Sequence, residues 1–458
     1  MPRFAKASRG RLWRSGPAAL LMAVLVSCAS EEGDAGSDAI GPAAAPVTGT
    51  AASSTAPGMA AGKPALPPGL WKRARVRSTD ADLSAEERER VRQLESLGYA
   101  AGSVPASEGS VITLHSPART QPGVNLFTSG HAPEALLVDM DGRILHRWHR
   151  SFESLWPDSD RPAPPYWRRA RLFPNGDLLV VFEGQGLAKL DRHSQAVWTS
   201  PARAHHDLEI LASGEIYVLT REVNRIEGIH RGRPFLEDFI SVLGSDGRET
   251  RRVSLLEALI ESPYRHLFDP SKSAFGDLLH TNSIRVLDGR LADRVPAFTS
   301  GRVLVSMAVP SLIAVVDLDL ARVVWAYRSD FRHQHDPRIL ENGHLLFFDN
   351  AGQPGVSRVI EIDPGTLEER WSYAGDPDHP FFTQTCGTAQ RLDNGNTLIT
   401  ESDNGRAFEV SPDGAIVWEF QNPNRAGPDG NYVATLFEMV RLPANFPLWV
   451  DHITEETP

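Results

Sequence analysis

The sequence predicts an all-β fold, a six-bladed β-propeller, and three observations support this prediction. A short unit recurs through the C-terminal two thirds of the chain, its copies lie at near-constant spacing, and turn signals separate its short apolar runs. Each unit reads approximately Leu-x-Asn-Gly-x-Leu-Leu-Val and later Asp-x-Asp-Gly-x-Val-x-Trp, as in 172–198, 340–371 and 392–418. Repeats of roughly 40–50 residues with four strands are typical of propellers.

The closing tryptophans set the number of units. Trp148 and Trp198 lie 50 residues apart, and Trp325, Trp371 and Trp418 follow one another at 46 and 47 residues. The gap of 127 residues between Trp198 and Trp325 holds two units, of which the one at about 208–253 lacks its tryptophan. The count is therefore six, with five or seven blades as the alternatives.

Within each unit the apolar runs predict strands joined by tight turns. Asn-Gly, Asp-Gly and Pro-Gly pairs bound these runs and are hairpin signals. We expect Leu345, Phe347, Val359 and Ile362 to alternate along their strands and to pack against the next blade.

The first 28 residues predict a lipoprotein signal. A basic stretch from Arg3 to Arg14 precedes an apolar run, Ala18 to Val26, that is too short to span a membrane as a mature helix. Leu25-Val26-Ser27-Cys28 resembles a lipobox, so we expect lipid on Cys28; an ordinary secretory signal is the alternative. Because Ala29 rather than Asp follows, the pattern favours the periplasmic face of a bacterial outer membrane.

Two further segments precede the repeats. Residues 29–80 are rich in Ala, Gly, Pro and Ser, which predicts a disordered tether. In residues 81–110 the run Ser84-Ala-Glu-Glu87 has the pattern of a capping box and predicts one short helix. The propeller domain is expected to occupy residues 111–458.

Composition excludes several classes of function. The formal net charge of −11 opposes a nucleic-acid partner. No glycine-rich phosphate-binding motif lies between a strand and a helix, so no nucleotide cofactor is expected. If Cys28 carries lipid, Cys386 is the single remaining cysteine, and the domain is held by its core rather than by a disulfide.

Histidines recur at one position of the repeat. Counting back eight or nine residues from the turn glycine reaches His206, His280 and His335 in three units and Arg168 in another. The first strand of each propeller blade is innermost, so equivalent positions converge around the central channel. We therefore predict a ring of imidazoles there, with Asn282 on the same strand face as His280.

The neighbours of these histidines are predicted to face the other way. Side chains alternate along a strand, so Asp207 and Asp336 are expected to be structural. His205 and His333 are also expected to turn away from the channel, unless a β-bulge reverses them.

Four segments resemble motifs of the bacterial arylsulfotransferases, over roughly residues 120–450. They are His205-His206-Asp207-Leu208, Leu279-His280-Thr281-Asn282-Ser283, Gln334-His335-Asp336-Pro337 and the run Gly387 to Ile399. The resemblance implies an exported six-bladed propeller that moves a sulfuryl group from an aryl sulfate to a phenol through a sulfohistidine. It also implies no phosphoadenosine sulfate, no other cofactor and no metal.

The resemblance also implies roles for individual residues. His335 maps to the nucleophile, and His206 and His280 map to supporting catalytic histidines. We expect Asn282, Arg168 and His205 to contact the substrate.

One position departs from the family pattern. The family has an arginine in a Val-Ser-x-Arg context, where this chain has Leu304-Val-Ser-Met-Ala-Val309 with Ala308 at the arginine's place. By analogy with phosphoryl transfer, losing a fixed positive group costs on the order of 10²–10³ in rate. Arg168, Arg169 and Arg358 are the candidates to replace it.

Two other functions remain open from the sequence. The same three histidines are suited to a catalytic zinc with one open coordination position. A propeller that lacks the arginine is also suited to binding aromatic or sulfated ligands without turnover.

Overall fold

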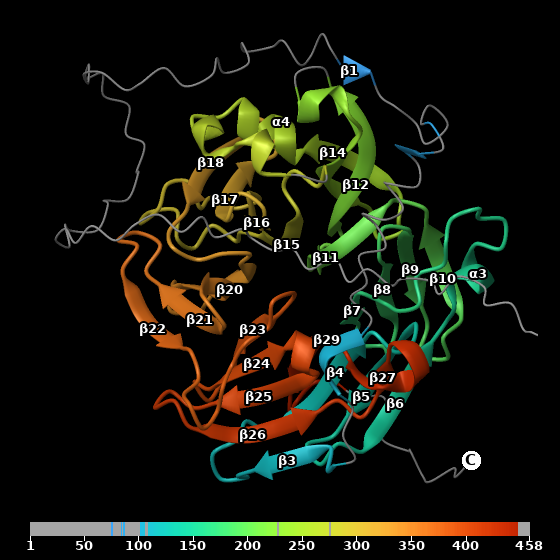
Figure 1. Cartoon of the computed structure of the whole chain (residues 1–458), viewed down its shortest axis with the longest axis vertical. Helices are drawn as coiled ribbons and strands as arrows, with labels where there is room; N and C mark the ends of the chain where they lie inside the picture. The colour runs from blue at the N-terminus through green and yellow to red at the C-terminus, as the bar shows by residue number, and fades with distance from the viewer. Residues whose placement is uncertain are drawn as a thin grey trace, which may run out of the picture. The chain divides into compact units, whose positions relative to one another are not determined.

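The innermost strand of each large sheet begins a run of antiparallel strands that leads outward. In the computed structural model, the residues described are 75–76, 84, 86–87, 101–105, 109–226, 229–273 and 276–447, all within the unit formed by residues 46–458. In these ranges six antiparallel sheets have four or five strands each, and a smaller sheet has three. Figure 1 shows the large sheets arranged around a common centre. The predicted all-β, propeller-like fold is confirmed.

Four of the large sheets are built from consecutive strands. The first contains β7 (Arg169–Leu172), β8 (Leu178–Phe182), β9 (Gly186–Leu190) and β10 (Ala196–Ser200). The second contains β11 (Ala204–Ile210), β12 (Ile216–Ile226), β13 (Phe235–Leu243) and β14 (Glu249–Ser254). The third contains β15 (Thr281–Val286), β16 (Val303–Met307), β17 (Leu312–Asp317) and β18 (Arg322–Tyr327). The fourth contains β19 (His335–Ile339), β20 (Leu345–Gln353), β21 (Val356–Ile362) and β22 (Glu369–Tyr373).

The remaining two large sheets join distant parts of the chain. One contains β23 (Thr388–Arg391), β24 (Thr397–Glu401), β25 (Arg406–Val410) and β26 (Ile416–Gln421), and β3 (Ile112–His115) pairs with β26 at its outer edge. The other contains β29 (Leu436–Pro443), β4 (Gly123–Ser129), β5 (Glu134–Val138) and β6 (Ile144–His149). The pairing of β29 with β4 therefore completes a sheet from both ends of the repeat region.

Short elements occupy the connections. The three-stranded sheet contains β2 (Ala101–Pro105), β28 (Tyr432–Ala434) and β27 (Arg425–Ala426). The α-helices are α3 (Phe152–Leu155) and α4 (Leu255–Ile260), and the 3₁₀ turns are η2 (His230–Gly232), η3 (Arg265–Leu267), η4 (Pro270–Lys272), η5 (Ser402–Asn404) and η6 (Pro428–Gly430). None of the helices in the described part of the chain is long and apolar enough to cross a membrane.

The repeated tryptophans link one sheet to the next. The indole N–H of Trp148 donates to the Gly176 carbonyl at 3.1 Å, and that of Trp198 donates to the Ser245 carbonyl at 3.1 Å. Both acceptors lie in turns of the following sheet. These contacts therefore attach each of the two tryptophans to the neighbouring sheet.

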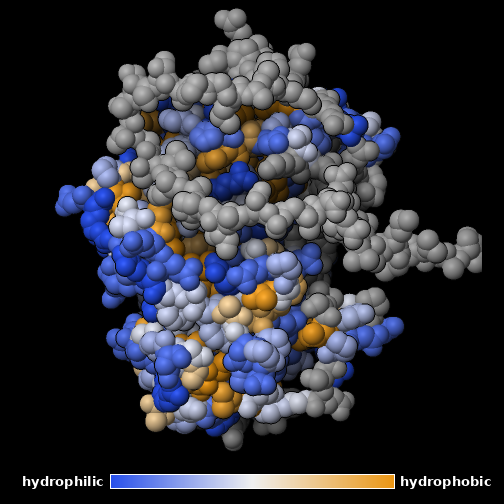
Figure 2. Space-filling view, turned by 60° about the vertical axis from the view of Figure 1, so that its left-hand side comes forward, coloured by the Kyte–Doolittle hydropathy of each residue, from blue (hydrophilic) through white to orange (hydrophobic). Residues whose placement is uncertain are grey.

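The hydrophobic core lies between neighbouring sheets. The prediction that four apolar residues of one sheet all pack against the next sheet is wrong for three of them. Leu345, Phe347 and Ile362 pack in one cluster with residues of the preceding sheet, including Ile313. Val359 packs in a different cluster, with residues of the following sheet. The sheet is covered on both faces, so its apolar residues form a continuous run rather than an alternating set. On the face in Figure 2 the described surface is mostly hydrophilic, with hydrophobic residues in strips.

The segments before the repeats differ in part from the prediction. The signal residues 1–28, with Cys28, lie outside the described residues. The capping box is confirmed: Ser84 N–H donates to Glu87 Oε2 at 3.0 Å, and Glu87 N–H donates to Ser84 Oγ at 3.2 Å. Glu86 and Glu87 are helical, as expected. In contrast, β1 (Arg75–Val76) falls in the predicted tether and pairs with β12, and β2, a strand that was not predicted, pairs with β28. Edge pairing with existing strands orders both pieces.

Asp207 is structural, as predicted, and it joins three inner strands. It is fully buried on β11. Its carboxylate forms ion pairs with Arg171 of β7 at 2.9 Å and with Arg285 of β15 at 2.5 Å. Arg169 of β7 lies 3.4 Å from it. Burial opposes ionisation of Asp207, but the guanidinium groups outweigh it and hold the pKa of this carboxyl below its usual range.

Asp336 and Glu438 extend the same network to the other inner strands. Asp336 of β19 is paired with Arg285 at 2.6 Å and Arg338 at 2.9 Å, and it accepts the backbone N–H of Ala389 of β23 at 3.2 Å. Glu438 of β29 lies 3.5 Å from Arg338 and also pairs with the two arginines of β7. One ionic network therefore touches β7, β11, β15, β19, β23 and β29.

Replacement of Asp207 by alanine tests this network. Asp207→Ala leaves buried guanidinium groups without their counter-ion, and we expect the free energy of unfolding to fall by about 3–5 kcal/mol. Urea denaturation measures the change. Asp319→Ala is the control, because Asp319 pairs with Arg251 at 2.8 Å on the surface and is 88% exposed, so little change is expected. A similar small change for both variants would contradict the structural role.

Candidate active site

The three predicted histidines lie at or next to β-bulges in their inner strands. The strand pairing shifts between Ala204 and Leu208, between Thr281 and Ser283, and between His335 and Arg338. Bulges re-aim side chains and are common beside active sites. His206 and His280 also have left-handed backbones, with φ of 55° and 48°. For a residue other than glycine this conformation costs about 1–3 kcal/mol, so surrounding contacts must hold it.

A carboxylate holds each of these two strained histidines. The backbone N–H of His206 donates to Glu183 Oε2 at 3.0 Å, and that of His280 donates to Asp277 Oδ1 at 3.1 Å. Each carboxylate also reaches the ring of the same residue, at 3.4 Å for Glu183 and 2.6 Å for Asp277. The two carboxylates therefore fix both the backbone and the ring of the histidine that they contact.

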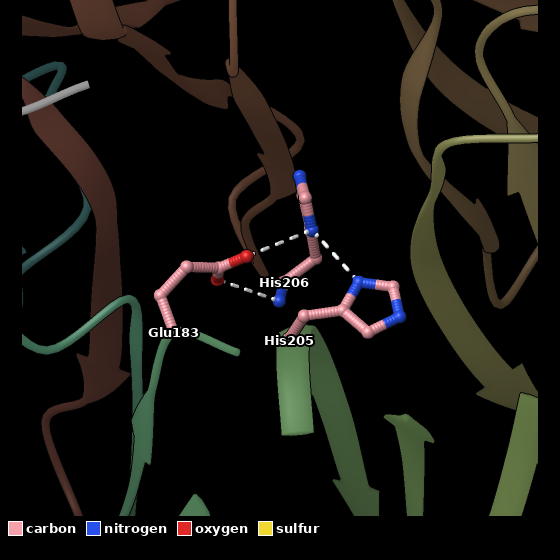
Figure 3. Close-up of side chains that lie close together, drawn as sticks. All are labelled: Glu183, His205 and His206. Atoms are coloured by element: carbon pink, nitrogen blue, oxygen red, sulfur yellow. Dashed lines mark hydrogen bonds and ion pairs between the residues drawn. The ribbon is translucent and has the colours of Figure 1, made fainter. Parts of the chain in front are cut away.

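His205 lies against His206 rather than turning away, as Figure 3 shows. Its Nδ1 lies 3.0 Å from Nδ1 of His206, and its Nε2 lies 3.6 Å from Asp238. The bulge in β11 reverses the alternation that the sequence predicts. Burial, together with nearby positive groups, lowers the pKa of His205 and His206 well below the usual value, so both imidazoles are neutral.

His280 has the opposite electrostatic setting. Its ring lies 4.8 Å from the ring of His206, and it retains 21% of its side-chain exposure. Burial opposes a charge on His280, but the adjacent Asp277 carboxylate outweighs burial and raises the pKa of this imidazole. His280 is therefore the histidine of the three predicted ones that favours the cationic form.

The neutral form of His335 has one defined tautomer. Its Nδ1 lies 2.8 Å from the carbonyl oxygen of His333 and 2.8 Å from Asn350 Oδ1. Asn350 Nδ2 donates to the carbonyls of Thr383 and Cys386 at 3.0 and 2.7 Å, which identifies the oxygen as the atom that faces His335. Both partners of Nδ1 are acceptors, so Nδ1 carries the proton and Nε2 keeps its lone pair.

Burial also keeps His335 uncharged. Desolvation, aided by the positive charges of Arg168 and His280, lowers the pKa of His335 to about 3. Contacts also connect Arg168 to His335, because Asn350 donates to the Cys386 carbonyl at 2.7 Å and Arg168 donates to Cys386 Sγ at 3.4 Å. The arrangement presents a neutral, nucleophilic nitrogen at any pH above this value.

Of the three candidate replacement arginines, Arg168 lies at this cluster. It is 2% exposed, its Nη2 donates to Cys386 Sγ at 3.4 Å, and its Nε lies 3.9 Å from Glu183. Arg169 belongs instead to the ionic network, and Arg358 lies 3.7 Å from Asp349.

A further arginine, Arg221, approaches the same Glu183 carboxylate at 3.6 Å. Its Nη2 lies so close to Gly184 that a Cβ there would be 2.8 Å away, which explains the glycine.

Two predicted positions have different roles from those expected. Asn282 is fully buried; its Nδ2 donates to the Gln334 carbonyl at 2.9 Å, so it positions the residue before His335 rather than offering a surface to substrate. Ala308 donates its backbone N–H to the His280 carbonyl at 3.2 Å. The position of the missing arginine therefore adjoins the histidine cluster.

The residues with metal-ligand spacing in the structure differ from the three histidines that the sequence suggests for a zinc site. Within the ranges described, ligand atoms of Glu183, His205 and His206 lie within 4.8 Å of one another. However, Arg168 and Arg221 flank Glu183, and the two histidines bond to each other. We interpret the group as a hydrogen-bonded cluster rather than as a metal site. A cavity of about 330 Å³ lies elsewhere, lined by Glu209, Arg285 and Arg338 among others.

Sequence reasoning missed four residues of the cluster. Glu183, Arg221 and Asn350 lie on outer strands or turns, where the repeat gives no signal for convergence on the centre. Asp277 had a usable signal, because Asp-x-x-His places a carboxylate one turn before His280, as the structure shows. The histidines were found by their distance from the turn glycine of each repeat, and that count does not take in the Asp-x-x-His spacing.

The site thus combines a propeller-like arrangement with histidines of opposite charge preference. The sequence profile of the arylsulfotransferase (ASST) family matches residues 169–423, which is more than half of the chain. The chain therefore belongs to the arylsulfotransferase family. No match to a curated protein was found.

Several solved structures are similar to the chain at low identity. A protein of unknown function from Bacteroides caccae is 11% identical, with a TM-score of 0.46 over 69% of this chain and 98% of its own. The Cps50 (Swd1) β-propeller domain from Myceliophteria thermophila is 11% identical, with a TM-score of 0.39 over 70% and 89%. Virginiamycin B lyase from Staphylococcus aureus is 12% identical, with a TM-score of 0.33 over 56% and 69%. These similarities are too weak to assign a function.

Nitrogen-15 NMR of histidine rings tests the assignment for His335. With a pKa of about 3, the ring should remain neutral at pH 5, protonated on Nδ1 and not on Nε2. An imidazole at the usual pKa of about 6.5 would be mostly cationic at that pH. Asn350→Ala should leave the ring neutral and still protonated on Nδ1, because the His333 carbonyl remains as an acceptor at 2.8 Å. Protonation of His335 with a midpoint near the usual value would contradict the assignment.

Proposed function

We propose that this protein is a sulfuryl transferase that moves the group from an aryl sulfate to a phenol through His335. The observation that carries the proposal is the tautomer of His335, whose Nδ1 faces two acceptor oxygens and leaves Nε2 as a neutral nucleophile. A covalent step through such a nucleophile divides one difficult displacement into two easier ones. Membership of the arylsulfotransferase family supports this reaction class.

The residues around His335 suit a group that carries negative charge on its oxygens. Arg168 is buried, and its charge acts on both His206 and His335. Fixed positive groups in a water-poor site stabilise the charge of the transition state. We propose that Arg168 substitutes for the arginine that Ala308 replaces, while Arg221 and Glu183 hold it in place.

The proposal includes a six-bladed propeller and export. The six large sheets and the contacts among their inner strands support the blade count. The signal and the lipobox-like Cys28 support a lipid-anchored protein on the periplasmic face, with aryl sulfates and phenols as small-molecule partners. The reaction needs neither phosphoadenosine sulfate nor another cofactor.

The anchor is tested by Cys28→Ala. In a bacterial host that processes lipoproteins, we expect the wild type in the outer-membrane fraction and the variant in the soluble periplasmic fraction. Fractionation followed by immunoblotting measures this. A variant that stays in the membrane, or a wild type that is soluble, would show that Cys28 is not an anchor.

The covalent intermediate is tested with chelator-treated protein and a chromogenic aryl sulfate. Without acceptor, intact-mass analysis should show one added sulfuryl group, and peptide mapping should place it on His335. His335→Ala should lose both adduct and transfer, because it removes the attacking atom. His206→Ala should slow the reaction by about 10²-fold or more, in line with the loss of a positioned polar group.

Other outcomes of this experiment separate the alternative functions. An adduct on another residue, or full transfer by His335→Ala, refutes the proposed nucleophile. Activity that disappears with the chelator and returns with zinc favours a metal enzyme at Glu183, His205 and His206. Tight binding of aryl sulfates without cleavage favours a binding module.

A further inference from the structure

We infer that Asp277 is a positioning residue that makes His280 the proton donor and acceptor of the site, so that the enzyme uses sulfates of weakly acidic phenols. The inference rests on the proposed transfer reaction and adds to it the chemical class of phenol that the site serves. An unsubstituted phenol leaves poorly as an anion, whereas an acidic one such as 4-nitrophenol needs little help. A site equipped with a proton donor removes much of this difference.

The geometry defines which nitrogen of His280 is held by Asp277 and which one can transfer a proton. Asp277 accepts from both the backbone N–H, at 3.1 Å, and Nδ1 of the same residue, at 2.6 Å. This double contact fixes the ring and commits Nδ1 to the carboxylate, so the Nε2 proton is the one available for transfer. The ring lies edge to face with His206, at 4.8 Å between centroids and 78° between planes.

The groups around the pair support a cationic His280. Asp277 and Asp238 favour its charge, whereas Arg221 and burial oppose it, and the pKa of His280 is raised in balance. The pKa of Asp238 is raised to about 7, by burial and by the neighbouring Asp277 carboxylate. Asp277 therefore carries the negative charge, and its partner His280 carries the proton. His206 is neutral and does not compete for this role.

The proton and electron pairs balance over the two half-reactions. His335 Nε2 attacks sulfur, the N–S bond forms, and the S–O bond breaks with its electron pair on the phenol oxygen. His280 Nε2 gives its proton to that oxygen, and a neutral phenol leaves. In the second half, the acceptor phenol returns a proton to His280 while its oxygen attacks sulfur. The N–S bond then breaks and its pair returns to His335.

The chain contains a natural control for Asp277. On the surface, Asp376 accepts from the backbone N–H of His379 at 2.8 Å and lies 3.2 Å from its Nδ1, with the same three-residue spacing. Both members of this pair are more than half exposed. Asp376→Asn therefore removes the same local contacts as Asp277→Asn, at a place away from the histidine cluster.

The experiment measures sulfurylation of His335 in single turnover, with a series of aryl sulfates whose phenols span a range of acidity. For Asp277→Asn we expect a loss of about 10²-fold with phenyl sulfate and within about 3-fold with 4-nitrophenyl sulfate. The rate should therefore depend much more steeply on phenol acidity in this variant than in the wild type. Asp376→Asn should match the wild type across the series.

Three outcomes overturn the inference. A loss of the same size for every donor shows that Asp277 only supports the structure. If Asp277→Asn does not fold, the wild type decides alone: a steep dependence on phenol acidity shows that no proton donor operates. An unchanged slope in a folded Asp277→Asn also refutes the role. Failure of the proposed function is distinct, because the wild type then forms no adduct with any donor.

Discussion

The buried ionic network of the inner strands is the constraint on which the histidine cluster depends. Asp207, Asp336 and Glu438, with their arginines, touch all six inner strands. Arg168, His206 and His335 each directly precede a member of this network in the sequence. Because adjacent residues share a backbone, fixing one residue in the network restrains the position of its neighbour in the cluster. The ion pairs thereby fix how neighbouring inner strands are aligned, which hydrophobic contacts alone would define less strictly.

The cluster divides two chemical roles between histidines by their surroundings. Among the described residues, His335 Nδ1 faces two uncharged acceptor oxygens, so burial keeps the ring neutral. His280 faces Asp277, which offsets burial and favours its charge. In the proposed reaction the same side chain thus supplies a nucleophile in one strand and an acid in another. The group that contacts the ring, an uncharged acceptor oxygen or a carboxylate, therefore decides which form each histidine favours.

The sequence was informative wherever the signal was local or periodic. The repeat, its tryptophans, the capping box and the structural role of Asp207 and Asp336 all follow from spacing and alternation. The side to which His205 points did not follow, since a bulge interrupts the strand between Ala204 and Leu208. Partners such as Asn350 and Glu183 were also beyond reach, because contacts between sheets join residues with no fixed separation in the chain. The fold could therefore be predicted more fully than the residues that hold the histidines in place.

The pairing of β29 with β4 has a consequence for how the protein is made. Residues 436–443 complete the sheet that begins at residue 123, and Glu438 carries the ionic network to that sheet. A nascent chain cannot close the structure until its last strand has left the ribosome, and such distant pairings form slowly. Prematurely terminated products would thus lack both the closing strand and a correctly framed histidine cluster.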